Sequence, residues 1–126
     1  MITADTSTWV AYLQGDDGED TRLLDQALRD RQALMVPVVL TELLSDSGIA
    51  PNVAKTLSEM PRIELDSGYW VRAGFLRAKV LAQGLRARLG DALIAQSCID
   101  RGVRLVTRDR DFRAFAESGG LVVLLA

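Results

Sequence analysis

The chain has 126 residues, of which 48% are hydrophobic and 25% charged, a balance that fits one folded domain and is too apolar for a disordered chain. No stretch approaches the roughly 20 uncharged apolar residues of a membrane span. The absence of histidine excludes Ser-His-Asp catalysis and histidine-ligated zinc, and the single cysteine, Cys98, excludes an internal disulfide. We therefore expect one domain over residues 1–126, in a reducing, cytoplasmic setting and without membrane partners.

The net charge of −2 conceals an uneven distribution. Residues 1–66 hold 12 acidic and 5 basic side chains, a net charge of −7, whereas residues 67–126 hold 5 acidic and 10 basic ones, a net charge of +5. This asymmetry is compatible with an acidic site beside a basic rim or with a nucleic-acid partner. Charge alone favours the simpler interpretation, solvated helix faces of different sign.

Short apolar runs alternate with amphipathic segments along the chain. In chain order, the pattern predicts a strand at 1–4, helices at 6–14 and 20–31, a strand at 33–36, helices at 37–46 and 52–60, a strand at 62–65, helices at 67–83 and 90–101, a strand at 103–106, a helix at 109–116 and a strand at 121–125. The helix at 67–83 places Trp70, Gly74, Ala78 and Leu81 on one face, which is typical of a core or a dimer contact.

Short strands separated by helices predict an α/β fold, an α/β/α three-layer sandwich with a mainly parallel sheet. Right-handed crossovers place the helices on both faces of such a sheet. Ligands then bind outside the carboxyl ends of the strands, where the strand order reverses. The residues that follow each strand are therefore the candidates for chemistry.

Carboxylates lie close to several of these strand ends. Asp5 directly follows the first strand, and Glu42 lies early in the helix after the second. Asp91 opens a helix, whereas Asp109 and Asp111 follow the strand at 103–106. Taken singly, each has a structural explanation, as a helix cap, a solvated helix residue or a charge at the positive end of a helix.

Taken together, the acidic residues favour a metal site. Carboxylates that converge on one cleft repel one another and raise their own pKa values. A divalent cation relieves this repulsion, and oxygen ligands without histidine or cysteine select Mg²⁺ or Mn²⁺ over zinc. The expected chemistry is phosphodiester hydrolysis by a metal-activated water. Thr6, Ser7 and Thr107 are suited to hydrogen bonds that orient the carboxylates.

Five motifs carry a resemblance to a known family. They are Asp5-Thr6-Ser7, Pro37 with Glu42-Leu43-Leu44, Gly90-Asp91-Ala92-Leu93-Ile94-Ala95, Thr107-Arg108-Asp109-Arg110-Asp111-Phe112 and Gly120-Leu121. On these motifs, and over essentially the whole chain, the sequence resembles the PIN-domain ribonucleases. In size it is similar to the VapC-type toxins of bacterial toxin–antitoxin pairs.

The resemblance implies a function and a set of site residues. It implies that Asp5, Glu42, Asp91 and Asp109 bind Mg²⁺ or Mn²⁺ and catalyse endonucleolytic cleavage of RNA. Asp111 is the ambiguous ligand, and we favour Asp109. The resemblance also implies a homodimer and a small cognate antitoxin whose tail blocks the cleft.

Two arginine pairs lie close to the expected ligands. Arg86 and Arg88 precede Asp91, and Arg108 and Arg110 flank Asp109. We expect some of them to contact RNA phosphate or an antitoxin carboxylate, against the alternative of ordinary solvated arginines.

Three other functions stay open at this point. A phospho-acceptor or binding module also has an acidic pocket, but it needs a lysine near a later strand, and both Lys55 and Lys79 fall in expected helices. The same fold with another substrate, structured DNA or a phosphomonoester, is the second alternative. The third is a PIN-like chain that lacks ribonuclease activity and only binds its antitoxin.

Overall fold

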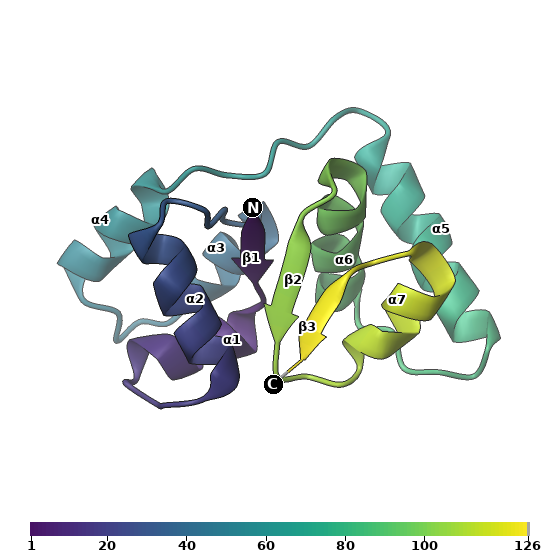
Figure 1. Cartoon of the computed structure of the whole chain (residues 1–126). Coiled ribbons are helices and arrows are strands. Elements are labelled where there is room, and N and C mark those ends of the chain that lie inside the picture. Colours follow the sequence, from purple (N-terminus) through teal and green to yellow (C-terminus); the bar gives the residue numbers. More distant parts are fainter. Residues whose placement is uncertain (126) are drawn as a thin grey trace.

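The computed structural model describes residues 1–125. Its centre is a parallel sheet of three strands in the order β1-β2-β3, formed by β1 (Ile2–Ala4), β2 (Arg104–Thr107) and β3 (Val123–Leu125). Ala4 lies opposite Val106, and Thr107 lies opposite Leu125. The carboxyl ends of the three strands therefore meet at one edge of the sheet (Figure 1).

Seven helices are present among residues 1–125: α1 (Thr6–Leu13), α2 (Glu19–Arg29), α3 (Pro37–Leu44), α4 (Pro51–Glu59), α5 (Tyr69–Ala82), α6 (Leu89–Arg101) and α7 (Phe112–Gly119). Helices α1 and α2 pack together on one side of the sheet, and α5, α6 and α7 pack together on the other (Figure 1). Helix α2 contacts β1 and β2, whereas α6 contacts β2 and α7 contacts β3. The expected α/β class with a parallel sheet is confirmed.

The strands expected at 33–36 and 62–65 are only isolated bridges. Ala33 pairs with Ile2 and Met35 pairs with Arg62, both in parallel. The first segment cannot extend as a strand because Val36 already caps α3 and Pro37 begins that helix. The segments at 33–36 and 62–65 thus lie on one side of β1, whereas β2 and β3 lie on its other side. The strand order reverses between β1 and β2.

Two helices begin later than expected. Helix α7 begins at Phe112 and not at 109, because the chain after β2 forms a turn first. In this turn the Asp109 N–H donates to Thr107 Oγ1 (2.9 Å), and the Asp111 N–H donates to Asp109 Oδ1 (2.9 Å). Helix α5 begins at Tyr69, after a turn that the Asp66 side chain closes. The late start of α7 leaves Asp109 on a loop at the edge of the sheet.

The core contains apolar side chains from both helical layers and the sheet. Its largest fully buried members include Trp9, Leu24, Leu105 and Phe115. Cys98 belongs to this core, and burial raises the pKa of its thiol to about 12. None of the helices within residues 1–125 combines the length and apolarity needed to cross a membrane. This core fixes the strands in place, and with them the polar residues that follow their carboxyl ends.

Candidate metal centre

Asp5 lies at the carboxyl end of β1 and is almost fully buried. It is the N-cap of α1, and its Oδ1 accepts the N–H of Thr8 (3.2 Å). Its Oδ2 accepts two hydroxyl hydrogen bonds, from Ser7 and from Thr107, each at 2.8 Å. These three donors fix the carboxylate in one orientation.

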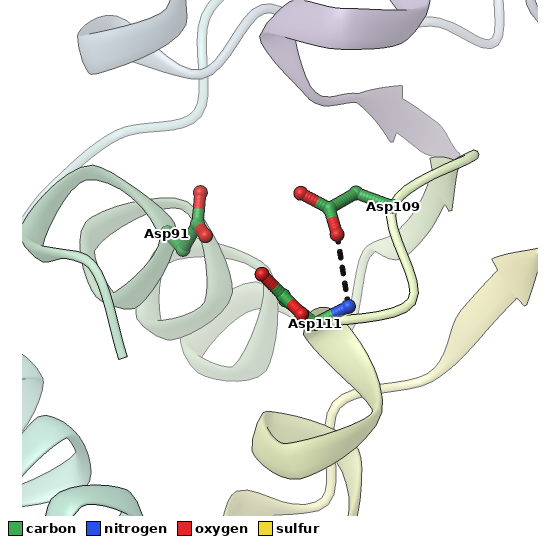
Figure 2. A group of neighbouring side chains, drawn as sticks. All are labelled: Asp91, Asp109 and Asp111. Carbon is green, nitrogen blue, oxygen red and sulfur yellow. Dashed lines mark hydrogen bonds between the residues drawn. The ribbon is translucent and has the colours of Figure 1, made fainter. Parts of the chain in front are cut away.

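Three more carboxylates lie beside each other near this edge (Figure 2). Asp91 is in the first turn of α6, Asp109 follows β2, and Asp111 precedes α7. One carboxylate oxygen of each lies within 4.8 Å of the others, and all three residues are partly buried. Figure 2 shows that Asp91 faces the other two from the opposite side of the gap.

A pocket of about 140 Å³ brings the expected acidic residues together. It is lined by Asp5, Thr6, Ser7, Glu42, Arg88, Asp91, Ile94 and Asp109. Glu42 reaches it from α3 and accepts a hydrogen bond from Thr6 (2.8 Å). The structure therefore gathers four of the five predicted carboxylates around one space. Asp111 borders the neighbouring pocket instead.

The electrostatics of the pocket reflect crowding of negative charge. Burial, and then the charges of Asp109 and Asp5, raise the pKa of Asp91 to about 6, although Arg88 opposes this shift. Burial also raises the pKa of Asp5, against the hydrogen bonds that favour its ionised form. Carboxylate oxygens in this arrangement are ligands that Mg²⁺ and Mn²⁺ prefer, so the donor set fits a hard divalent cation.

The four arginines predicted near the site differ in their surroundings. Arg88 lines the acidic pocket, and Arg86 lies 3.9 Å from Asp111 between Nη1 and Oδ2. Arg86 and Arg110 both line a second pocket of about 250 Å³ beside it. Arg108 instead forms a forked ion pair with Asp20, at 2.7 and 3.0 Å. Three of the four thus border the space around the carboxylates.

Asp20 is a polar residue of this region that the sequence analysis missed. Its side chain is only 1% exposed, although it ends an acidic run at 16–20, a composition typical of a solvated loop and the first turn of a helix. The spacing of residues along the helix could have indicated that Asp20 is buried. Asp20, Leu24 and Ala27 lie at positions i, i+4 and i+7, on the buried face of α2.

The sequence is similar to known proteins over most of its length. The sequence matches the PIN domain family over residues 2–118. It is 32% identical over 125 residues to VapC ribonuclease Mb1587 of Mycobacterium bovis and to Ribonuclease VapC11 of Mycobacterium tuberculosis, and each match covers 92% of both chains.

Solved structures share the fold. VapBC2 from Rickettsia felis, bound to a DNA fragment from its promoter, aligns with a TM-score of 0.74 and 23% identity, over 100% of this chain and 99% of that chain. DNA-bound VapBC from Salmonella typhimurium aligns with a TM-score of 0.73 and 22% identity, over 98% of both chains. At these identities the structures bear on the fold alone.

The raised pKa of Asp91 predicts a pH-dependent stability of the metal-free protein. Because the folded-state pKa, about 6, exceeds the ordinary value of 3.8, the folded protein binds more protons than the unfolded chain between these values. Stability therefore falls as the pH rises from about 4 through 6. We expect Asp91→Asn to abolish this loss. At pH 7.5 its free energy of unfolding should exceed that of wild type by about 1 kcal/mol after solvent screening, and it should melt roughly 3–5 °C higher.

Thermal unfolding in the presence of a chelator, at pH 4 and pH 7.5, measures this effect. The increase in melting temperature of Asp91→Asn over wild type should shrink towards zero at pH 4. Glu59→Gln, which removes an exposed charge from α4, is the control for a simple change in net charge. A gain of equal size at both pH values would contradict the assignment.

Proposed function

This chain belongs to the PIN domain family, and we propose that it is a metal-dependent endoribonuclease that acts as the toxin of a toxin–antitoxin pair. The observation that carries the proposal is the convergence of Asp5, Glu42, Asp91 and Asp109 on one pocket where the strand order reverses. Relatives that are named VapC ribonucleases support RNA as the substrate. The proposed location is the cytoplasm, because a chain with a single cysteine forms no internal disulfide and fits a reducing compartment.

The four carboxylates would hold one or more Mg²⁺ or Mn²⁺ ions. A bound ion supplies activation of water and stabilisation of the negative charge that develops on the phosphate. Between the two aspartates after β2, we favour Asp109 as the closer ligand. It shares the pocket with Asp5 and Glu42, whereas Asp111 borders the neighbouring pocket.

The remaining pocket residues orient these ligands and the substrate. Ser7 and Thr107 hold Asp5, and Thr6 holds Glu42, each through a hydroxyl that donates to a carboxylate oxygen. The guanidinium of Arg88, at the rim of the same pocket, would bind a phosphate oxygen of the RNA. A phospho-acceptor role has less support, because neither lysine lines this pocket and Lys79 donates to the carbonyl of Ser118.

An RNA cleavage assay tests this proposal. Protein free of antitoxin should cut single-stranded or loop RNA with Mg²⁺ or Mn²⁺ and stop when a chelator is added. Asp5→Asn and Asp109→Asn should each lower the cleavage rate at least about 100-fold, because each removes a charged ligand, and Asp111→Asn should lower it less.

Asp30→Asn, on the exposed end of α2, is the matched control and should cleave at the wild-type rate. Folded wild-type protein that cuts no RNA with either ion would contradict the proposal. It would favour a chain that keeps the fold and only binds an antitoxin.

We expect the arginines around the pocket to bind RNA phosphates. Replacing both Arg86 and Arg88 by alanine should weaken RNA binding measured in chelator, where the RNA stays intact. The slope of log affinity against log salt concentration should fall by about 1.4, if each arginine contacts one phosphate of a single strand.

The matched control is Arg104→Ala, which removes one exposed arginine from the amino end of β2, at the opposite edge of the sheet. Its salt slope should stay at the wild-type value. An unchanged slope for the Arg86 and Arg88 double variant would show that these side chains are ordinary solvated arginines.

A third, more apolar pocket supports the proposed antitoxin partner. It has a volume of about 320 Å³ and lies between α1, α3 and the start of α4. Its apolar lining residues are Val10, Leu13, Leu43, Ile49, Ala50 and Val53. Glu42 lines both this pocket and the acidic one. A partner segment seated here would reach the metal centre, which supports inhibition by an antitoxin tail.

An apolar face of α5 supports the proposed homodimer. Trp70, Val71 and Phe75 are 61%, 61% and 72% exposed, an unusual amount of apolar surface for one face of a helix. Gly74, Ala78 and Leu81 lie on the same face. A second copy of the chain would bury this surface.

Sedimentation equilibrium tests the homodimer. Phe75→Glu should raise the dimer dissociation constant at least about 10-fold, because it places a charge in an apolar interface. Leu23→Glu, on α2 at the other side of the sheet, adds the same charge at another exposed leucine and should leave the constant unchanged. Equal weakening by both variants would argue against the α5 interface.

A further inference from the structure

A partly buried ion pair links α2 to the loop that follows β2. The Arg108 guanidinium donates from Nε and Nη2 to the two carboxylate oxygens of Asp20, at 2.7 and 3.0 Å. The Thr8 hydroxyl donates to Asp20 Oδ2 as well (2.9 Å). The Asp20 side chain is 1% exposed, whereas that of Arg108 is 40% exposed. The pair thus holds three separate segments of the chain together.

The same segments carry the donors that hold Asp5. Thr8 donates its backbone N–H to Asp5 and its hydroxyl to Asp20. Arg108 follows Thr107, whose hydroxyl donates to Asp5 Oδ2 and accepts from the N–H of Asp109. Hydrogen bonds and chain connectivity therefore form a closed ring that runs through Asp5, Thr8, Asp20, Arg108 and Thr107. Asp20 and Arg108 belong to this ring but do not line the acidic pocket themselves.

We propose that Asp20 and Arg108 are positioning residues for the metal centre, which fix Asp5 and Asp109 relative to each other. This proposal rests on the proposed metal-dependent function. Because removing the Asp20 carboxylate from water offsets much of the attraction, such an ion pair contributes little net stability compared with an apolar pair of the same size, and its value here is the geometry that it imposes. Outer residues that orient ligands in this way commonly change metal affinity 10- to 100-fold when they are replaced.

The loop before α2 accommodates the pair closely. A side-chain carbon added at Gly18 would lie 2.9 Å from Asp20 Oδ1 and 3.5 Å from Arg108 Nη2. A second pair in the same region lacks these links. Arg22 forms the same fork with Asp17, at 2.9 and 3.0 Å, but their side chains are 69% and 76% exposed. It offers a matched control on the surface.

Mn²⁺ binding to RNA-free protein, measured by isothermal titration, tests the proposal together with thermal unfolding of the metal-free samples. Asp20→Asn keeps the shape of the side chain and leaves an arginine that can reach solvent. We expect its Mn²⁺ dissociation constant to rise roughly 10-fold or more. The Mn²⁺ concentration that half-saturates RNA cleavage should rise by the same factor, with the rate at saturating Mn²⁺ near the wild-type rate.

Two further variants keep the test decisive. Arg108→Lys retains the positive charge but loses the paired hydrogen bonds of the guanidinium to Asp20, so we expect an intermediate loss of Mn²⁺ affinity. This variant provides the test if Asp20→Asn does not fold. Asp17→Asn removes the matched surface pair and should bind Mn²⁺ with wild-type affinity.

Three results would overturn the positioning role. The first is wild-type Mn²⁺ affinity in folded Asp20→Asn and Arg108→Lys, even if both melt at lower temperature. The second is an equal loss of affinity in Asp17→Asn. The third is recovery of affinity in a variant with both Asp20→Asn and Arg108→Gln, which would trace the loss to the released arginine charge. Failure of wild type itself to bind Mn²⁺ or cut RNA would instead reject the proposed function.

Discussion

Repulsion between carboxylates that are held close together is the constraint around which this site is organised. Burial and the charges of Asp109 and Asp5 raise the pKa of Asp91, so the metal-free pocket is electrostatically unfavourable. Hydroxyl donors on Asp5 and Glu42 offset part of this cost and also fix the two side chains. A divalent cation would bind the same oxygens and neutralise their charge. The pocket is therefore unfavourable without metal but already arranged to bind it.

The fold creates this crowding through the order of its strands. Asp5 follows β1 and Asp109 follows β2, and these neighbouring strands are parallel, so both side chains emerge at one edge. Helices α3 and α6 then bring Glu42 and Asp91 to the same pocket from outside the sheet. The apolar core holds these elements rigidly, and the reversal of strand order leaves space for a pocket at the carboxyl ends of the strands.

Local sequence patterns predicted most elements and the acidic pocket, but they failed where long-range contacts decide. The runs before Asp5 and Asp109 were recognisable as strands, because they are short and mostly apolar. The segment at 33–36 has the same composition, but it forms a single bridge because Pro37 begins a helix at once. Nothing local indicates that Arg108 pairs with Asp20, 88 positions earlier, and not with an RNA phosphate. The pairing becomes evident only once α2 lies against the sheet.

The hydrogen bond from Thr107 to Asp5 joins residues 102 positions apart, almost the full length of the chain. During synthesis, the amino-terminal strand and its carboxylate leave the ribosome long before β2 exists. The metal centre therefore cannot assemble on a growing chain until the segment through residue 109 has emerged and docked beside β1. A translation product that stops before Thr107 lacks both this residue and Asp109, so it cannot carry a finished centre.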